Sequence, residues 1–491
     1  MAAVVSSLLH VMESSVWADE VSVELPAGFE IKKWVGDEVT PDAACMGIDA
    51  QGNLVVSGRG YLKRLRVSNE TGKVDAVESI ADFPGVAQGI LFDGDRVWLT
   101  ANKAILRSKV RRGADQPYEF ETVCKVTTDV EHGAHAIRKG PDNWIYVLCG
   151  NKTAIRPEYF SLKTSPIKTP RAGFLMRFPA DVEPDNFAAE IVCHGFRNPY
   201  DFDFDSQGRI YVFDSDGERD VSLPWYRPTR LFQVGAGDDG GWVSTSWKRP
   251  AKFFDMPKRI GDFGRGSPTG VEICPDDRFG ESFRHAIFVG DWTFGRIGVA
   301  KYDSETGQYG PVEVFAKPKN HFGFAVTDLE FATDGSLLVS TGGRRTEGAI
   351  YRITRPGQEF SKAPAAALKF DDVTQFSAAT VRALRPEVSA KAPSVVALLA
   401  QVEARKDRDF DIAVLNYLSQ RSLADAQGPK TVELLGRLLA RCAVDVANEG
   451  NAELLLAGRR FVATVSESLS CLLYTSPSPR DQRGSRMPAS A

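Results

Sequence analysis

The chain has 491 residues, of which 43% are hydrophobic and 25% are charged. This is the composition of an ordinary globular protein, and it excludes collagenous and intrinsically disordered chains. The 60 Lys and Arg residues against 64 Asp and Glu residues give a net charge of −4, which argues against nucleic-acid binding because that function needs a basic face. The sequence lacks the long apolar run that a membrane-spanning helix requires, so we expect no transmembrane segment.

Residues 1–20 have features of an export signal. An apolar stretch over residues 2–12 leads to Val16-Trp17-Ala18, which carries small residues where a signal peptidase would cut. No basic residue precedes this stretch and Glu13 follows it, so a shortened signal and a loosely packed leader both stay open. The signal favours a periplasmic or extracellular protein.

The cysteines exclude several kinds of site. The chain has seven of them, and none forms a CxxC pair, so zinc ribbons, thioredoxin-like sites and CxxCH haem attachment are absent from the sequence. Their wide spacing favours buried free thiols, although an exported protein could also form a few disulfides.

One strand–turn–strand pattern recurs between residues 45 and 341. Each copy is an apolar strand, a turn rich in Asp, Asn or Gly, and a second apolar strand; the copies cover 46–57, 89–100, 136–148, 201–213, 270–289 and 328–340. Their separation fits the roughly 40–50 residues of a four-stranded blade, with some insertions. We therefore predict a mainly β fold, a six-bladed β-propeller over residues 21–355, which explains the repeats better than an open sandwich does. Residues 21–35 should pair with 348–353 to close the ring.

The stretches between the hairpins are unequal in length. We interpret the longest as inter-blade loops at one end of the channel, at 101–132, 150–195, 214–268 and 291–327. After a linker at 356–373, residues 374–465 become rich in Ala and Leu with helical spacing and favour a truncated α-helical repeat region of HEAT type. The segment from residue 471 to 491 resembles a translated sequencing adapter and is expected to be a non-native, disordered tail.

Three motifs add up to a family resemblance. His132 precedes GAHAIRKGPDNWIYV, Arg197-Asn198-Pro199 precedes YDFDFDSQGRIYV, and Gln88 lies just before ILFDGD. With these motifs the propeller resembles the soluble quinoprotein glucose/sorbosone dehydrogenase superfamily. Together with the helical region, it is similar to exported bacterial proteins that join such a propeller to HEAT repeats and often to a c-type cytochrome.

The resemblance implies roles for particular residues. His132 would be the catalytic base, while Arg197, Asn198 and Gln88 would contact the cofactor pyrroloquinoline quinone (PQQ). The family's calcium loop falls on a stretch rich in oxygen donors that does not match the family pattern residue for residue; its candidate Ca²⁺ ligands are Asp214, Asp216 and Asp220. The family's pair of cofactor-gripping arginines is also missing, and the residues that could replace it are Arg296, Arg344 and Arg345. The implied substrate is a sugar or polyol, and the implied partner is a cytochrome c domain or protein.

The chemistry of these residue types agrees with such a reaction. An imidazole titrates near neutral pH and can accept the hydroxyl proton when a CH–OH group is oxidised. PQQ is a tricarboxylate, which Arg side chains and a hard cation such as Ca²⁺ would bind.

Other interpretations stay open at this point. His132 and His135 could form a metal pair or be hydrogen-bonded loop histidines, Arg197-Asn198 could be a clamp between blades, and the aspartates could form a solvated turn. For the whole chain, the alternatives are a Ca²⁺-dependent lactonase-type propeller and a non-catalytic propeller that binds glycans or proteins. The dehydrogenase interpretation requires His132, Arg197 and Asn198 to converge at one end of the channel.

Overall fold

The structure is a computed structural model that describes most of the chain between residues 22 and 355. The described residues are 22–68, 73–101, 103–110, 116–126, 131–160, 162, 165, 167–206, 208–235, 237–245, 247–250, 256–320, 324–355, 399, 400, 403, 414, 415 and 433–440. Those beyond residue 398 are helical. The expected leader, the linker, the tail and the repeat pattern of 374–465 lie outside the described residues and stay predictions.

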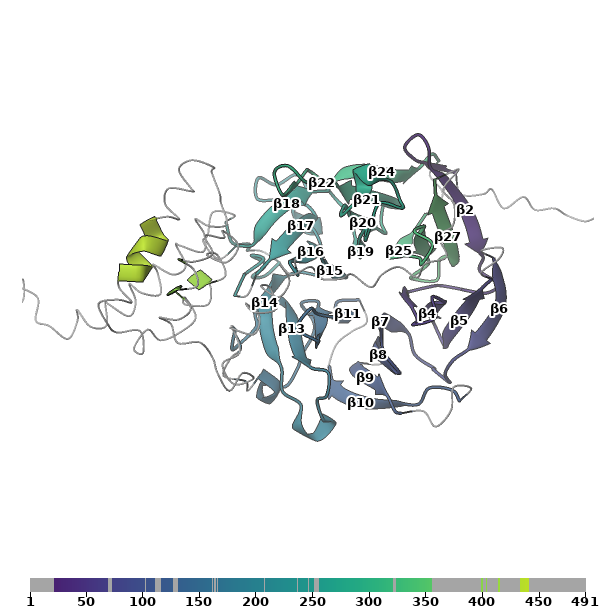
Figure 1. Ribbon diagram of the computed structural model, residues 1–491, viewed down its shortest axis with the longest axis horizontal. Helices are drawn as coiled ribbons and strands as arrows, with labels where there is room; N and C mark the ends of the chain where they lie inside the picture. Colours follow the sequence, from purple (N-terminus) through teal and green to yellow (C-terminus); the bar gives the residue numbers. More distant parts are fainter. Residues whose placement is uncertain are drawn as a thin grey trace, which may run out of the picture.

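Six antiparallel sheets surround a central channel, which confirms the six-bladed β-propeller (Figure 1). From the channel outward, blade 1 is β3 (Cys45–Ile48), β4 (Leu54–Gly58), β5 (Tyr61–Val67) and β6 (Val74–Ser79). Blade 2 is β7 (Ala87–Asp93), β8 (Arg96–Ala101), β9 (Ala104–Ser108) and β10 (Phe120–Lys125). Blade 3 is β11 (Ala134–Lys139), β12 (Trp144–Cys149), β13 (Gly173–Pro179) and β14 (Glu190–Phe196).

The second half of the ring continues the same order. Blade 4 is β15 (Phe202–Phe204), β16 (Ile210–Asp214), β17 (Arg230–Val234) and β18 (Lys258–Asp262). Blade 5 is β19 (Pro268–Ile273), β20 (Ile287–Asp291), β21 (Arg296–Ala300), β24 (Glu313–Pro318) and β1 (Val23–Glu24). Blade 6 is β25 (Val326–Phe331), β26 (Leu337–Thr341), β27 (Ala349–Thr354) and β2 (Glu30–Val35).

Small elements decorate the blades. Strands β22 (Tyr302–Asp303) and β23 (Gln308–Tyr309) form a hairpin, and the 3₁₀ turns are η1 (Pro157–Phe160), η2 (Pro184–Asn186), η3 (Glu218–Asp220) and η4 (Glu281–Phe283). No helix among the described residues combines the length and apolar character needed to cross a bilayer.

Each repeated hairpin is the inner strand pair of one blade. The turn after β3 shows how the sequence specifies it: Asp49 Oδ1 accepts the backbone N–H groups of Gln51 at 3.0 Å and Asn53 at 2.8 Å, while Gly52 has a φ of +83° that favours glycine. Asp205 repeats the arrangement in blade 4, where its Oδ1 accepts the N–H of Arg209 at 2.9 Å. These turns all lie at one end of the channel.

The ring closes with a strand from each end of the propeller, as the sequence predicts. Strand β2 pairs with β27, placing Glu30 opposite Thr354. Residues 23 and 24 depart from the prediction, because β1 pairs with β24 of blade 5 instead. The amino-terminal segment therefore contributes the outermost strand of two neighbouring blades.

The prediction that four long stretches are loops was wrong in one respect, because these stretches also contain strands. The four stretches contain the outer strands of blades 2 to 5, such as β10 with the sequence FETVCK and β18 with KRIGD. Outer strands are short and carry charged residues that discourage pairing with other chains, so their alternation is weak in the sequence.

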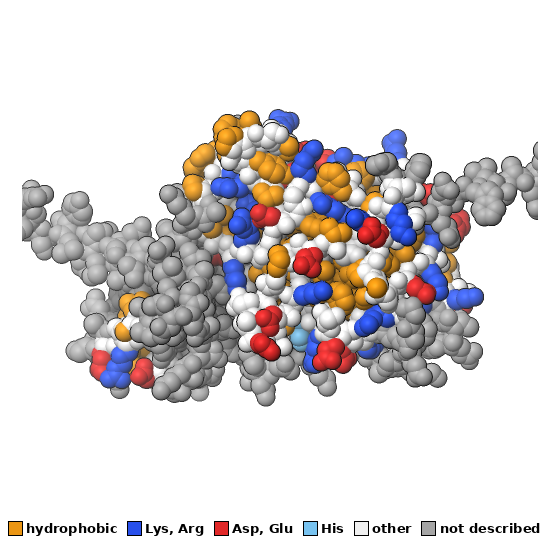
Figure 2. Space-filling model, turned by 90° about the horizontal axis from the view of Figure 1, so that it is seen from above, with side chains coloured by type: hydrophobic (Ala, Val, Ile, Leu, Met, Phe, Trp, Pro, Cys, Tyr) orange, Lys and Arg blue, Asp and Glu red, His pale blue; other side chains and the backbone are white. Residues whose placement is uncertain are grey.

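The hydrophobic core lies between neighbouring sheets. One cluster of buried residues is packed between each pair of adjacent blades. Between blades 2 and 3, for example, it contains Trp98, Phe174 and Phe178. The five cysteines among the described residues are buried free thiols, as expected: Cys45, Cys124, Cys149, Cys193 and Cys274. On the outside, basic and acidic side chains intermix with apolar ones over the side of the molecule shown in Figure 2, in keeping with the small net charge.

Candidate functional site

The predicted site residues come from segments that lead into inner strands, at the end of the channel opposite the hairpin turns. We call this end the mouth. His132 precedes β11, Arg197 and Asn198 precede β15, and Gln88 is the second residue of β7. Three consecutive blades therefore bring these side chains to the same end of the channel.

His132 is buried, with only 8% of its surface exposed, and its ring is oriented by Asn151. Nδ1 lies 2.6 Å from Asn151 Oδ1, and because this oxygen can only accept a hydrogen bond, Nδ1 carries the proton. The lone pair is therefore on Nε2, on the opposite side of the ring. Burial lowers the pKa of His132, and the nearby Arg197 and Lys152 lower this pKa further. The imidazole is thus neutral at neutral pH and can act as a base.

Asp214 holds the turn that carries Arg197 and Asn198. Its Oδ1 accepts the backbone N–H groups of both residues, each at 3.0 Å, and its carboxylate lies 3.8 Å from Arg230 Nη2. Asp214 is completely buried, and this burial raises its pKa, while Arg230 and the two N–H groups act in the opposite direction. Its role in the structure is to position the turn.

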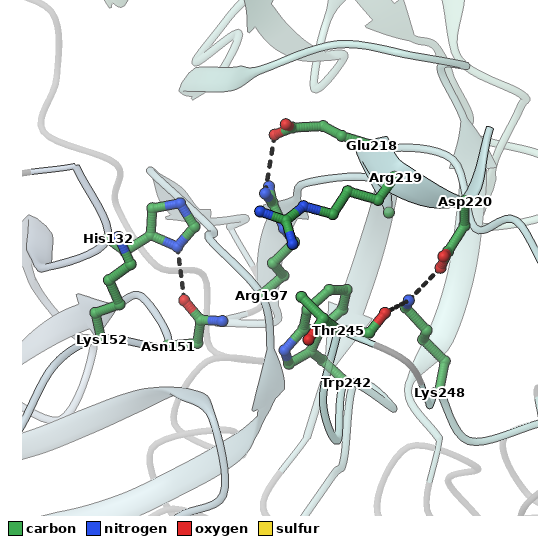
Figure 3. A pocket seen from close by; sticks show the side chains of 11 residues that line it. His132, Asn151, Lys152, Arg197, Glu218, Arg219, Asp220, Trp242, Thr245 and Lys248 are labelled. Carbon is green, nitrogen blue, oxygen red and sulfur yellow. Dashed lines mark hydrogen bonds and ion pairs between the residues drawn. The ribbon is translucent and has the colours of Figure 1, made fainter.

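Arg197 and His132 face each other across a pocket of about 220 Å³, which we call the side pocket (Figure 3). The Arg197 guanidinium donates to Ser215 Oγ at 3.1 Å, pairs with Glu218 at 2.9 Å and lies 5.7 Å from the centre of the Trp242 ring. The remaining lining residues are mostly polar: Asn151, Lys152, Gly217, Arg219, Asp220, Thr245 and Lys248. An imidazole base and a fixed guanidinium therefore meet in one cavity.

The three aspartates predicted to bind Ca²⁺ have separate partners. Asp214 binds the Arg197–Asn198 turn, Asp216 Oδ2 accepts the Tyr226 hydroxyl at 2.8 Å, and Asp220 is paired with Lys248. Among the described residues, no group of three or more His, Cys, Asp or Glu side chains is arranged to hold a metal ion. The residues present here therefore do not fit the calcium site implied by the resemblance.

A second cavity of about 300 Å³, the axial pocket, lies at the mouth among loops of several blades. Gln88, Asn198 and Arg344 all line it, together with Tyr200 and Trp292. Asn198 Oδ1 is buried and accepts no hydrogen bond from the described residues.

The arginines proposed to replace the missing pair differ in position. Arg344 lies at the axial pocket, with its guanidinium 5.2 Å from the centre of the Trp292 ring. Arg296 instead donates to Asp291 at 2.7 Å and to the carbonyl of Phe263, and it lines neither mouth pocket. Only Arg344 of these two is therefore placed to meet a ligand in the axial pocket.

His135 does not form a metal site with His132. It is completely buried, its Nδ1 lies 3.0 Å from the carbonyl of Pro199, and its ring stacks on Tyr200 with centroids 4.3 Å apart. Its position supports a structural role beneath the mouth.

Gly150 brings the segments of blades 3 and 4 together. A Cβ atom at this position would lie 2.6 Å from Asn198 Oδ1 and 2.7 Å from the backbone carbonyl of His132. Neither approach is sterically allowed, so only glycine lets His132 and Asn198 come this close. Sequence reasoning missed Gly150, Asn151 and Trp242; the first two follow buried strand β12, and such positions at a strand end are the signal that could have found them.

Gln88 and Tyr200 form the floor of the axial pocket. The Tyr200 hydroxyl donates to Gln88 Oε1, and both residues also line a cavity of about 420 Å³ that we call the lower channel. Five acidic side chains gather in or beside it, around the guanidinium of Arg138: Asp201, Asp203, Glu272, Asp328 and Glu330.

Most of these carboxylates connect the inner strands of adjacent blades. Asp201 Oδ2 accepts the N–H of Val271 at 2.8 Å, and Asp328 Oδ2 accepts that of Met46 at 2.7 Å. Burial raises the pKa of Asp203 to about 6, that of Asp328 to about 7 and that of Glu330 to about 8, and the neighbouring carboxylates contribute to each increase. Arg138, 3.0 Å from Asp201 and 3.2 Å from Glu272, partly compensates this crowding.

No family model and no curated protein sequence matches the chain. Solved structures do resemble it: the PQQ domain of a pyranose dehydrogenase from Coprinopsis cinerea has a TM-score of 0.53 and 16% identity, covering 68% of this chain and 97% of its own. A calcium structure of the Trichoderma reesei Carbohydrate-Active Enzymes family AA12 also has a TM-score of 0.53, with 14% identity over 68% of this chain and 97% of its own. At such identities the likeness establishes a shared fold.

Proposed function

We propose that the chain is a dehydrogenase that oxidises a CH–OH group of a sugar or polyol at the mouth, with a PQQ-type quinone in the axial pocket. The observation that carries this proposal is the meeting of a neutral His132 and the fixed guanidinium of Arg197 in the side pocket. A neutral imidazole can accept a hydroxyl proton, and a guanidinium stabilises the oxygen as negative charge develops on it.

The axial pocket has groups that fit a planar, carboxylate-bearing ring. Arg344 offers a charged donor stacked on Trp292, and the amides of Asn198 and Gln88 offer neutral donors and acceptors. When bound, a quinone would supply the acceptor for the two electrons and the hydrogen that leave the substrate carbon. The fit does not extend to Ca²⁺, for which the mouth aspartates are not grouped, and no part of the proposed reaction depends on that ion.

Other residues of the chain position the base and the guanidinium. Asn151 keeps the proton on Nδ1 of His132, so Nε2 receives the substrate proton. Asp214 fixes the backbone of Arg197 and Asn198, and Trp242 supports the Arg197 side chain. Export to the periplasm or outside the cell, and electron transfer to a cytochrome c domain or partner, belong to the same proposal through the resemblance in the sequence.

The lactonase alternative is less well supported. It requires several inward carboxylates around one cation, and such carboxylates are found in the lower channel, where the guanidinium of Arg138 lies among them. A non-catalytic binding propeller would not require the His132–Asn151 arrangement that leaves Nε2 as a base.

Reconstitution tests the proposal directly. The purified full chain is incubated with PQQ, with and without Ca²⁺, and binding is measured by equilibrium dialysis before dye-linked oxidation of a sugar panel. We expect PQQ binding and turnover in the chain, and loss of turnover but not of PQQ binding in His132→Asn. His285→Asn, a histidine at the hairpin end of blade 5, is the matched control and should keep both. A chain that binds no PQQ would refute the quinone, and turnover in His132→Asn equal to that of the parent would refute the assigned base.

A further inference from the structure

One ion pair crosses the mouth of the channel. Arg344 follows β26 of blade 6, Glu131 precedes β11 of blade 3, and Arg344 Nη2 donates to Glu131 Oε1. Blades 3 and 6 lie on opposite sides of the six-bladed ring (Figure 1). Both residues line the axial pocket and both side chains are more than half exposed, so the pair lies on the solvent-facing side of the pocket.

The loop that carries Arg344 is held in an unusual conformation. Four consecutive residues have positive φ: Gly342 at 152°, Gly343 at 77°, Arg344 at 54° and Arg345 at 66°. A left-handed conformation is unfavourable for residues with a Cβ, and it persists only where the surroundings enforce it.

Those surroundings are specific. Trp292 Nε1 donates to the Gly342 carbonyl at 2.7 Å, and the Arg345 N–H donates to Asp42 Oδ1 at 2.9 Å. A Cβ on Gly342 would lie 2.4 Å from the backbone of Ala43, so the loop packs tightly against blade 1. The backbone of Arg344 is thus fixed over the pocket, and its long side chain is the part that can move.

The pair itself is weak. The side chains of Arg344 and Glu131 are 63% and 58% exposed, and exposed ion pairs contribute little and are screened by salt. The Arg344 backbone is therefore fixed, while its ion pair with Glu131 is weak and exposed to water. Such a contact can break and re-form without a change in the backbone.

We propose that the Glu131–Arg344 pair is a strap that closes the mouth of the channel and opens to admit a ligand to the axial pocket. The strap acts through one exposed contact, so it opens by rotation of side chains without movement of the blades. The inference concerns access alone and holds for any ligand of the axial pocket, quinone or other.

Thiol labelling in the pocket tests the strap on the full chain without any cofactor. Val86 is half-buried and lines the axial pocket, so Val86→Cys places a reporter beneath the strap. Val77 on β6 is 45% exposed and lies on an outer strand, so Val77→Cys is the reporter outside the mouth. The rate of labelling by a bulky neutral maleimide is monitored by mass spectrometry. The labelling of the parent chain, which has only its own cysteines, is subtracted.

Removing the strap should expose the inner reporter. We expect Glu131→Gln to speed labelling of Cys at 86 by up to about fivefold at low salt, the range set by an exposed ion pair. High salt should speed labelling in the intact strap and have no effect in Glu131→Gln. Exchanging the charges, Glu131→Arg with Arg344→Glu, should restore slow labelling. Glu119→Gln, which breaks a similarly exposed pair with Lys109, is the matched control and should leave the rate of labelling unchanged.

Two results would overturn the strap. Labelling at position 86 that responds neither to Glu131→Gln nor to salt would show that the pair does not cover the pocket. A parallel increase at position 77 would show general loosening of the fold. Because no quinone is present, either result leaves the outcome of the reconstitution experiment untouched.

Discussion

The two ends of the channel use similar residue types for different purposes. In the lower channel, Asp201 and Asp328 accept backbone N–H groups of neighbouring blades, so their carboxylates are committed to holding the ring together. At the mouth, Asp214 has the same kind of bonds, but these present Arg197 and Asn198 to open cavities. A buried carboxylate can thus stabilise the fold alone, as Asp201 and Asp328 do, or hold a turn whose side chains line a cavity, as Asp214 does. The hydrogen-bonded pair of Gln88 and Tyr200 lies between the axial pocket and the lower channel and lines both.

The largest expected effect is at Arg138. Arg138→Met removes the guanidinium from among five acidic side chains, and leaving buried charges without their partner costs about 3–5 kcal/mol. Urea unfolding at pH 7 would measure the loss. Arg66→Met, which breaks the more exposed pair with Glu78, is the control and should cost much less, because water screens an exposed ion pair. Equal costs for the two variants would mean that the lower channel is not held together by Arg138.

Stability should fall as pH rises, because of the same carboxyl groups. Burial raises the pKa of Glu330 to about 8, whereas an unfolded Glu titrates near about 4.3. The folded state therefore binds more protons, so the stabilisation is complete below about pH 4 and is lost as pH rises toward 8, by up to about 1.4 kcal/mol per pH unit for this group. Unfolding measured from pH 5 to 8 should show a shallower decline in Glu330→Gln. An unchanged slope would contradict the assigned burial effect.

A methyl group at Gly150 tests whether the mouth depends on close packing of blades 3 and 4. Gly150→Ala should push Asn198 and the His132 backbone apart, costing about 1–3 kcal/mol of stability and more than about tenfold of any PQQ-dependent rate. Gly310→Ala, whose new Cβ would lie 3.8 Å from the nearest atom, should be neutral in both assays. A fully active Gly150→Ala would show that the close packing of the His132 and Asn198 segments around Gly150 is dispensable.

The smallest effect concerns the charge next to His132. Asn151→Asp places a carboxylate 2.6 Å from Nδ1 if the geometry is kept, and it should raise the pKa of His132 because a negative charge favours the imidazolium. Histidine titration by NMR would measure this change without any substrate, and the acid limb of a pH–rate profile should move upward by the same amount. Asn151→Leu, which has no acceptor, should give no such increase. An unaltered titration in Asn151→Asp would mean that Asn151 does not orient the ring.

Most of the fold could be predicted from the sequence because the inner hairpins carry their own turn chemistry. Asp49 with Gly52, and Asp205 with Gly208, specify turns locally, and the recurrence of strand–turn–strand units at blade-sized spacing defines the ring. The outer strands could not be predicted as well, since β18 has few apolar residues and depends on β17 for its place.

The mouth was predictable only in part. His132 and Arg197 stand out in motifs, whereas Arg344 reaches the axial pocket only because the ring closes and a left-handed loop brings it there. Asn151 and Gly150 matter through contacts between segments that are far apart in the sequence. The lower channel did leave a signal: acidic residues two apart on inner strands, Asp201 with Asp203 and Asp328 with Glu330, share one face of their strands and so point to the same cavity.

The pairing of β2 with β27 determines when the ring can close during synthesis of the chain. Strand β2 is among the first segments to be synthesised, yet its partner β27 ends at Thr354, so β2 can pair only after the last blade has left the ribosomal exit tunnel. The axial pocket at the mouth is lined by residues of all six blades and therefore cannot be complete on any nascent fragment that stops before blade 6. A newly made chain can therefore complete the geometry of the mouth only when its last strand is in place.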